Sequence, residues 1–292
     1  MTQIIPSLAT VADRYTAVFC DLWGCLHNGR EPFPAAVAAL RAFKARGGTV
    51  LLLTNSPRPR ASVVAQLDRI GVPRDCWDEI VSSGDATQIG LATGIIGTKV
   101  HHIGAEKDLT FFTDIPADLP QLAAITRVPM DQATGILCTG LRDDLSETPD
   151  DYRAALLMGK TLGLTMLCAN PDIIVDMGET RVFCAGALAA EYESMGGTAM
   201  YFGKPHPPVY DLARRKLAAL TGEEDHRILA IGDGIATDVQ GAAAEGIDAL
   251  FVTGGIAAAE FGPDAANPDP ARLAAWLGDQ QLSPPWAIGH LR

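Results

Sequence analysis

Short, uninterrupted apolar runs alternate along the chain with longer segments in which apolar residues recur every three or four positions. Residues 16–20 and 49–53 are runs of the kind found in strands that are covered on both faces. Residues 34–46 and 60–70 carry apolar side chains on one helical face, and glycine follows each segment. Late in the chain the same alternation predicts strands at residues 198–202, 228–231 and 249–252 and helices at residues 208–220 and 237–245.

This alternation predicts an α/β fold built on a doubly wound parallel sheet, because consecutive parallel strands are connected through helices. The middle of the chain follows a pattern of its own and is too long to be a loop in a compact domain. We therefore expect an inserted α/β domain at residues 84–182, between two parts of a core domain at residues 1–83 and 183–292. Further elements are expected at residues 99–103, 135–139, 150–162, 164–167 and 181–183, and the proline-rich tail is expected to wrap the surface with one short helix at residues 271–277.

The composition is that of an ordinary globular protein, with 48% hydrophobic and 20% charged residues among 292. A net charge of −12 argues against nucleic acid or an anionic membrane as the main partner. The six cysteines include no pair separated by two residues, which predicts reduced, buried thiols and a cytoplasmic location. We expect neither a secretory signal nor a membrane span, because no segment approaches the roughly 18 apolar residues that a span requires.

Polar residues with chemical potential follow four of the expected strands. Because the carboxyl ends of parallel strands open onto one crevice, positions 21, 54, 204 and 233 are expected to converge there. The four motifs are Asp21-Leu22-Trp23-Gly24, Thr54-Asn55, Gly203-Lys204-Pro205, and Gly232-Asp233 with Asp238. Together they supply a carboxylate nucleophile, neutral hydrogen-bond donors, a cation and a carboxylate metal site. Those are the parts needed to transfer a phosphoryl group through an aspartyl intermediate.

The carboxylates are the most specific of these signals. Asp21 is expected at the floor of the crevice, although aspartate at a strand end is also a common turn or helix cap. Asp233 and Asp238, five residues apart across a glycine-containing turn, would hold one hard cation together with Asp21. Asp238 by itself also suits the N-terminus of the helix expected at residues 237–245. The three carboxylates taken together favour a metal site.

The other two motifs offer neutral donors and one cation. Thr54 and Asn55 present a hydroxyl and an amide just before a helix whose N-terminal N–H groups point to the same place, which suits phosphate oxygens. Taken alone, this pair is equally consistent with a helix cap. Lys204 is held between glycine and proline; a single lysine is usually a solvated surface charge, and only the other three motifs predict that this one points inward.

In their order and spacing, the four motifs resemble those of the haloacid dehalogenase superfamily. Three further features resemble its class IIA branch: the Gly-Lys-Pro form of the third motif, the segment Ala169-Asn170-Pro171-Asp172, and the long block at residues 231–253. That branch contains 4-nitrophenylphosphatase-like, pyridoxal phosphatase-like and nucleotide or sugar phosphatase proteins. The similarity extends over nearly the whole chain, and it implies a Rossmann-like core with a cap domain of the C2 type.

The resemblance also implies an activity and roles for individual residues. The activity would be Mg²⁺-dependent hydrolysis of a small phosphorylated metabolite, such as a sugar or aryl phosphate, with Asp21 as the nucleophile that forms an aspartyl phosphate. Magnesium would be held by Asp21, the main-chain carbonyl of Trp23 and Asp233, with Asp238 close by or acting through water. The transferred phosphoryl group would be held by Thr54, Asn55 and Lys204.

Trp23 departs from the family pattern, in which a second, proton-donating aspartate would stand two residues after the nucleophile. Tryptophan still offers a carbonyl to the metal but no general acid, and such help is typically worth about 10² to 10⁴ in rate. Three interpretations stay open: a leaving group that needs little protonation, another acid such as His27, or a slow or silent protein that binds a phosphorylated ligand. A metal-free dehalogenase would also carry an aromatic residue here, but Asp233 and Asp238 argue against it.

The expected partners are therefore Mg²⁺ and a small phosphorylated substrate, with no nucleic acid and no membrane. A homodimer formed through the cap is a further expectation. The choice of substrate is expected to reside in the cap, where Asn170 and Asp172 are the only residues in an interpretable pattern.

Overall fold

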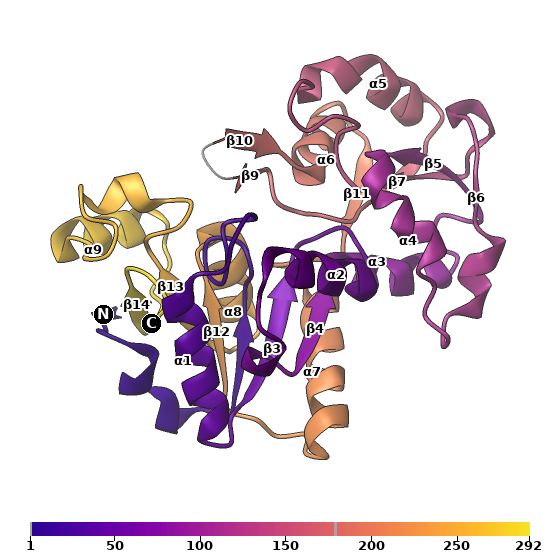
Figure 1. Cartoon of the computed structure of the whole chain (residues 1–292). Helices are drawn as coiled ribbons and strands as arrows, with labels where there is room; N and C mark the ends of the chain where they lie inside the picture. The colour runs from indigo at the N-terminus through magenta and orange to yellow at the C-terminus, as the bar shows by residue number, and fades with distance from the viewer. Residues whose placement is uncertain (1, 178–179) are drawn as a thin grey trace.

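The computed structural model describes residues 2–177 and 180–292, and it contains two parallel sheets stacked one above the other in Figure 1. In the larger sheet, the described strands follow the order β1-β14-β13-β12-β2-β3-β4, and every neighbouring pair is parallel. The strands are β1 (Gln3–Ile4), β2 (Ala17–Cys20), β3 (Thr49–Thr54), β4 (Glu79–Ser82), β12 (Ile228–Gly232), β13 (Asp248–Val252) and β14 (Trp286–Ile288).

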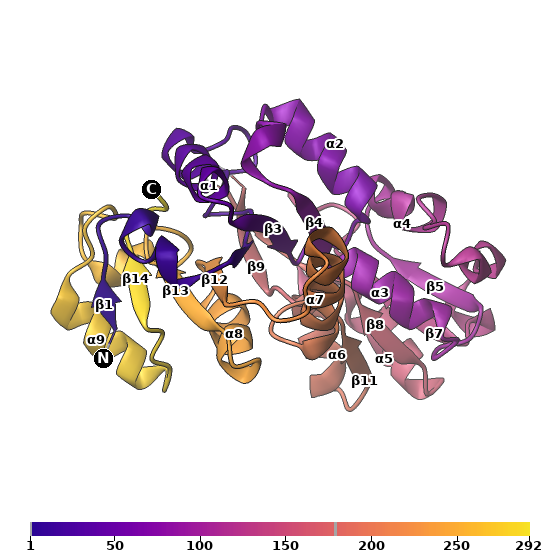
Figure 2. The ribbon, with the colours of Figure 1, turned by 90° about the horizontal axis from the view of Figure 1, so that it is seen from below.

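Helices cover both faces of this sheet, which explains why its central strands are apolar at every position. Along β2, Val18 and Cys20 pack against α1 and α2, whereas Ala17 and Phe19 face α7 on the other side. The view from below in Figure 2 shows α1 and α2 on one side of the strands and α7 and α8 on the other. The helices of this layer are α1 (Pro34–Ala45), α2 (Arg60–Ile70), α7 (Pro207–Thr221), α8 (Gln240–Ala244) and α9 (Pro270–Asp279).

The second sheet lies within the middle of the chain and has the order β11-β8-β7-β5-β6, again with parallel neighbours. Helices α5 and α6 pack on one of its faces, and α3 packs on the other. An antiparallel hairpin, β9–β10, extends from this layer toward the larger sheet (Figure 1). The strands are β5 (Lys99–Ile103), β6 (Thr126–Arg127), β7 (Gly135–Cys138), β8 (Thr165–Cys168), β9 (Ile174–Met177), β10 (Thr180–Phe183) and β11 (Thr198–Tyr201); the helices are α3 (Ser83–Ala92), α4 (Thr110–Thr113), α5 (Arg153–Thr161) and α6 (Ala185–Ser194).

One expected strand belongs to the other sheet. Residues 198–202 were expected in the core sheet, but β11 pairs in parallel with β8, with Thr198 opposite Thr165. The physical reason is that an apolar run suits any parallel strand covered on both faces, so the run does not say which sheet it joins. The second layer therefore extends past residue 182, whereas the domain boundaries at residues 84 and 182 themselves stay a prediction.

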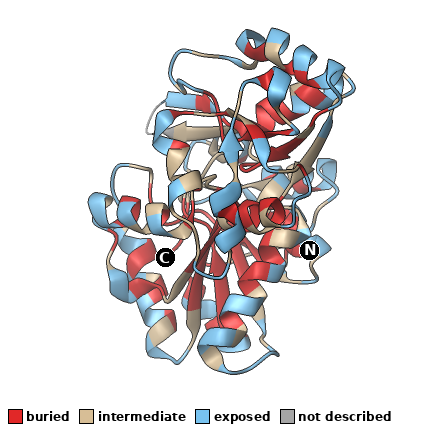
Figure 3. Cartoon of the chain, turned by 90° about the vertical axis from the view of Figure 1, so that its right-hand side faces the viewer, coloured by how far each residue is buried: buried red, intermediate tan, exposed pale blue. Residues whose placement is uncertain are grey.

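The helix expected at residues 237–245 is also different, because a π-helical turn at Ile235–Val239 precedes α8. Just after the proline-rich tail at residues 267–285, β14 joins the larger sheet between β13 and β1. The expected burial of all six cysteines is confirmed, and each of them is unpaired. Colouring by burial shows buried strands at the centre of both layers and exposed outer faces of the helices (Figure 3). Within residues 2–177 and 180–292, every helix is too short or too polar to cross a membrane.

Candidate active site

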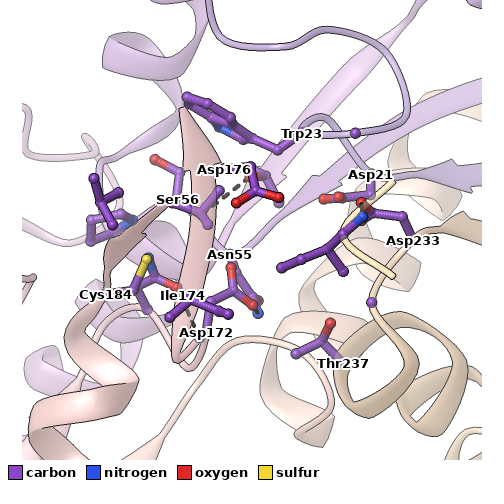
Figure 4. A pocket seen from close by; sticks show the side chains of 18 of the residues that line it. Asp21, Trp23, Asn55, Ser56, Asp172, Ile174, Asp176, Cys184, Asp233 and Thr237 are labelled. Carbon is purple, nitrogen blue, oxygen red and sulfur yellow. Dashed lines mark hydrogen bonds between the residues drawn. The ribbon is translucent and has the colours of Figure 1, made fainter. Parts of the chain in front are cut away.

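A cavity of about 350 Å³ lies between the two sheets, and residues from both layers line it. Strands β2, β3 and β12 end at this cavity from the larger sheet, while the ends of β7 and β8 and the β9–β10 hairpin enclose it from the other side. The insert therefore covers the crevice at the ends of these strands. Figure 4 shows Asp21, Asn55, Asp172 and Asp233 among the side chains that line the cavity. Of the residues singled out in the sequence, the cavity is lined by Asp21, Trp23, Thr54, Asn55, Asn170, Asp172, Lys204, Asp233 and Asp238.

Asp21 stands directly after β2, where its N–H donates to the carbonyl of Ile231 over 2.8 Å and fixes the backbone between two strands. Its Oδ1 accepts a hydrogen bond from the Lys204 ammonium at 2.7 Å, and the same ammonium donates to Oδ1 of Asp238 at 2.6 Å. Lys204 is only 2% exposed, so it is an inward-pointing cation. It follows β11 and thus reaches the site from the smaller sheet, not from the core sheet as expected.

The charges of this group are strongly interdependent. Burial raises the pKa of Asp21 above its usual range, and the neighbouring Lys204 ammonium opposes that rise. Burial, followed by the negative charges of Asp21 and Asp238, raises the pKa of Asp233 well above its usual range. Burial alone would lower the pKa of Lys204, but the carboxylates of Asp21 and Asp238 outweigh it and keep the lysine charged. One buried cation thus faces three crowded carboxyl groups, an arrangement that favours the binding of a further cation.

Asp233 follows β12 and is held in place by the main chain around it. Its Oδ2 accepts the N–H of Ile256 at 2.9 Å. Two glycines provide the room: a Cβ atom at Gly24 or at Gly255 would lie only 2.1 or 2.0 Å from this oxygen. Gly24 also has a φ of 73°, which a residue with a side chain adopts at a cost.

Among the described residues, Asp21, Asp233 and Cys25 form a group of possible metal ligands, whose ligand atoms all lie within 4.8 Å of one another. The carboxylates of Asp21 and Asp233 are therefore close enough to contact one ion. Cys25 was not singled out in the sequence, and the only available signal was its position four residues after Asp21. Burial, followed by the charges of Asp233 and Asp21, raises the pKa of its thiol, so the sulfur is protonated at neutral pH.

Asp238 lies outside this group and accepts a hydrogen bond from Lys204 instead. It sits in the π-helical turn at Ile235–Val239, where its Oδ2 accepts the N–H of Gly234 at 3.2 Å. The carboxylate thus contacts both this turn and the buried lysine, while its role in metal binding stays a prediction. Burial raises its pKa to about 6, and the nearby lysine opposes that shift.

Thr54 ends β3, and its hydroxyl oxygen accepts the N–H of Ser56 at 3.1 Å, which leaves the hydroxyl proton available to a ligand. The Asn55 side chain is occupied by protein partners. Its Oδ1 accepts the N–H of Lys204 at 2.7 Å, and its Nδ2 donates to the carbonyl of Lys204 at 3.0 Å and to Oδ1 of Asp172 at 2.8 Å. Asn55 therefore fixes the backbone of the lysine and ties it to the insert.

The hypothesis that His27 replaces the missing acid is contradicted by its position. His27 is completely buried under the Trp23 indole, whose ring centroid is 5.2 Å away, and it is not among the described residues that line the cavity. Its Nδ1 accepts the N–H of Gly29 at 3.0 Å. Burial lowers the pKa of the imidazole to about 4, so the ring is neutral at physiological pH.

Comparison with known proteins relates this geometry to a family. A model of haloacid dehalogenase-like hydrolases matches residues 18–115, and a HAD-hydrolase-like model matches residues 201–279. A crystal structure of a haloacid dehalogenase-like family hydrolase from Brucella suis 1330 is 40% identical to this chain. The match covers 98% of this chain and 99% of that one, with a TM-score of 0.85. The chain therefore belongs to the haloacid dehalogenase-like hydrolases.

Two more distant structures share the fold. The p-nitrophenyl phosphatase from Archaeoglobus fulgidus is 21% identical, with 94% of this chain and 96% of that one covered and a TM-score of 0.69. The glycerol phosphate phosphatase from Mycobacterium tuberculosis, solved in complex with magnesium, is 24% identical, with 90% and 74% covered and a TM-score of 0.61. These two likenesses support the α/β fold of the chain.

Proposed function

We propose that this protein is a Mg²⁺-dependent phosphohydrolase that acts on a small phosphorylated metabolite through an aspartyl phosphate. The observation that carries the proposal is the placement of the Asp21 carboxylate between the Lys204 ammonium and Asp233, at the floor of a cavity that the insert covers. A nucleophile, a fixed cation and a place for a metal are then within reach of one phosphoryl group. The phosphatase names of the two distant relatives support the same class of substrate.

The donor set around Asp21 fits a magnesium ion. Asp21 and Asp233 offer oxygen ligands, which hard cations prefer, and a divalent cation would favour the charged forms of these two carboxyl groups, whose pKa values are raised chiefly by burial. We propose that these two carboxylates and the main-chain carbonyl of Trp23 hold the ion, with Asp238 acting nearby. When bound, the metal would supply charge neutralisation and orientation of the phosphoryl group.

The chain's own residues would perform the remaining work. Asp21 attacks phosphorus and expels the leaving group, and water then attacks the aspartyl phosphate and releases inorganic phosphate. Lys204 neutralises charge on the transferred group, and Thr54 donates its free hydroxyl proton to a phosphate oxygen. We assign Asn55 chiefly to positioning, because its amide already binds the backbone of Lys204. The insert would exclude water while the reaction proceeds.

Trp23 supports one alternative, a slow or silent protein that binds a phosphorylated ligand, because it removes the usual proton donor from this position. The two functions are separated by incubation of the protein with 4-nitrophenyl phosphate and Mg²⁺. Steady release of 4-nitrophenol would support the hydrolase, whereas tight binding of phosphate esters without turnover would support the binding protein. The boundaries of the insert, a dimer formed through it and a cytoplasmic location stay predictions.

Removal of the metal gives a sharper expectation. Chelation with EDTA should abolish turnover of 4-nitrophenyl phosphate, and excess Mg²⁺ should restore it. The variant Asp233→Asn should raise the Mg²⁺ concentration that gives half-maximal activity by about 10- to 100-fold or more, since a charged ligand is lost. Titration of activity against Mg²⁺ measures this shift, and Asp264→Asn, a change in an exposed turn, serves as the matched control. An unchanged metal requirement in Asp233→Asn would contradict the proposed site.

A further inference from the structure

The loop after β8 brings another carboxylate into the cavity. Asp172 follows Asn170, whose side-chain oxygen accepts the N–H of Asp172 at 3.0 Å and so fixes the turn. Its Oδ1 accepts the Asn55 amide at 2.8 Å, a bond that joins the insert to the core motif (Figure 4). No hydrogen bond to its second oxygen, Oδ2, is found among the described residues, and the side chain lines the cavity.

Several charged or titratable groups from different elements surround Asp172. Lys204, after β11, attracts its negative charge, while Asp238 in the π-helical turn repels it. Its charge also raises the pKa of Asp21, so it lies within electrostatic range of the proposed nucleophile. The neighbouring thiols are Cys168 and Cys184, and burial raises the pKa of both, which keeps them neutral. On the adjoining hairpin, Asp176 and Arg181 neutralise each other.

Asp172 can carry a proton near neutral pH. Burial raises the pKa of its carboxyl group to about 6, although Lys204 and the Asn55 hydrogen bond oppose the shift. A general acid works best with a pKa near the working pH. The position also suits the task, because Asp172 lines the cavity from the loop after β8, in the insert, whereas Asp21 lines it from the end of β2, in the larger sheet.

We propose that Asp172 is the general acid of this hydrolase and protonates the leaving-group oxygen, which Trp23 cannot do. The inference rests on the proposed phosphohydrolase function. As the oxygen of Asp21 bonds to phosphorus, the bond from phosphorus to the leaving-group oxygen breaks. That oxygen keeps the electron pair and takes the proton of Asp172, so a neutral alcohol departs. In the second half, water bonds to phosphorus and gives its proton to Asp172, while the bond from phosphorus to Asp21 breaks.

Two other aspartates in the cavity fit this role less well. Asp176 is held by both Nε and Nη2 of Arg181, at 2.8 and 3.0 Å, so the guanidinium already occupies both of its oxygens. Burial raises the pKa of Asp108 to about 6, but the charges that act on it are Lys107, Arg58 and Asp144, not the groups beside Asp21. Asp176→Asn therefore provides a matched control, because it changes an aspartate of the same cavity and leaves the proposed acid intact.

The test compares two esters, 4-nitrophenyl phosphate with a good leaving group and glycerol 3-phosphate with a poor one. Asp172→Asn keeps an oxygen for the Asn55 amide but has no acidic proton. It should lower kcat/KM for glycerol 3-phosphate by about 10² to 10⁴, and for the aryl ester by less than about tenfold. Asp176→Asn should change both esters by the same factor. The double variant Trp23→Asp/Asp172→Asn should recover much of the alkyl ester activity, because it restores a carboxyl group near the nucleophile.

A pH profile of the wild-type protein tests the same role without any variant. The ratio of alkyl to aryl kcat/KM should be flat below the pKa of about 6 and fall about tenfold per pH unit above it, since only the protonated carboxyl group can donate. Equal losses of kcat/KM for both esters in Asp172→Asn would overturn the role of Asp172 but not the proposed function. The same holds for a ratio of alkyl to aryl kcat/KM that does not change with pH in the wild type. A wild type that cleaves neither ester would overturn the proposed function and this role with it.

Discussion

Replacing Asp21 with asparagine is expected to lower kcat by about 10⁴-fold or more while the protein stays folded. The amide keeps the shape of the carboxylate and retains an oxygen for the Lys204 hydrogen bond, which spans 2.7 Å in the native protein. It has no negative oxygen with which to attack phosphorus. Release of inorganic phosphate from 4-nitrophenyl phosphate measures the loss, and circular dichroism with thermal unfolding reports the fold.

The same variant should still bind the substrate, because the groups proposed to hold the phosphoryl group are unchanged. Calorimetric titration with the ester in the presence of Mg²⁺ would show this binding. Asp176→Asn is the control, as it removes one cavity carboxylate that is already neutralised by Arg181, and it should retain kcat within about tenfold. A folded Asp21→Asn protein that keeps a tenth of the native kcat would exclude Asp21 as the nucleophile.

Replacing Lys204 with methionine is expected to cost about 3–5 kcal/mol in the free energy of unfolding at pH 8, because it leaves two buried carboxylates without their cation. The ammonium is 2% exposed and contacts Asp21 and Asp238 at 2.7 and 2.6 Å. The variant should also lose about 10² to 10³ in kcat, the usual effect of removing one group that stabilises charge in the transition state. Urea denaturation and phosphate release measure the two effects.

The stability loss in Lys204→Met should depend on pH. Without the lysine, the pKa of Asp238, already raised to about 6 by burial, rises further above its unfolded value. A carboxyl group whose pKa is higher in the folded state binds more protons there, so stability falls as pH rises through that window. The deficit relative to the native protein should therefore be smaller at pH 5 than at pH 8.

Lys107→Met is the matched control for this variant. Lys107 also lines the cavity and pairs with Asp144, but its side chain is 55% exposed. Loss of such an exposed pair is expected to change stability by no more than about 1 kcal/mol at either pH. An equal, pH-independent loss in the two lysine variants would contradict a special role for the buried cation.

Local patterns were enough to predict most elements of the larger sheet. Helix α2 occupies Arg60–Ile70 as expected, because its apolar face and the glycine that follows it define both ends. Strands β1, β4 and β14 were missed; β1 and β14, with two and three residues, are too short to carry a detectable period. The prediction that residues 198–202 join the core sheet was wrong for a different reason. Strand pairing is decided by tertiary packing, and this apolar run suits either sheet.

The convergence of the four motifs was predictable, because the carboxyl ends of parallel strands open onto one crevice. Lys204 nevertheless reaches the cavity from the end of a strand in the smaller sheet. The contact between Asn55 and Asp172 was not predictable, because it joins residues 117 positions apart whose approach depends on how the insert packs. The burial of His27 was not predictable either, because the sequence does not show that the Trp23 indole packs against it. Sequence motifs thus indicated which residues gather at the site, but not which partner each of them contacts.

The stereochemical course at phosphorus tests the central claim, a covalent intermediate on Asp21, most directly. A phosphorothioate ester made chiral with oxygen-18 would be hydrolysed in water enriched in oxygen-17, and the configuration of the released thiophosphate determined. Attack by Asp21 followed by attack by water inverts phosphorus twice, so net retention is the expected result. Net inversion would mean that water attacks the substrate directly, and it would contradict the aspartyl phosphate.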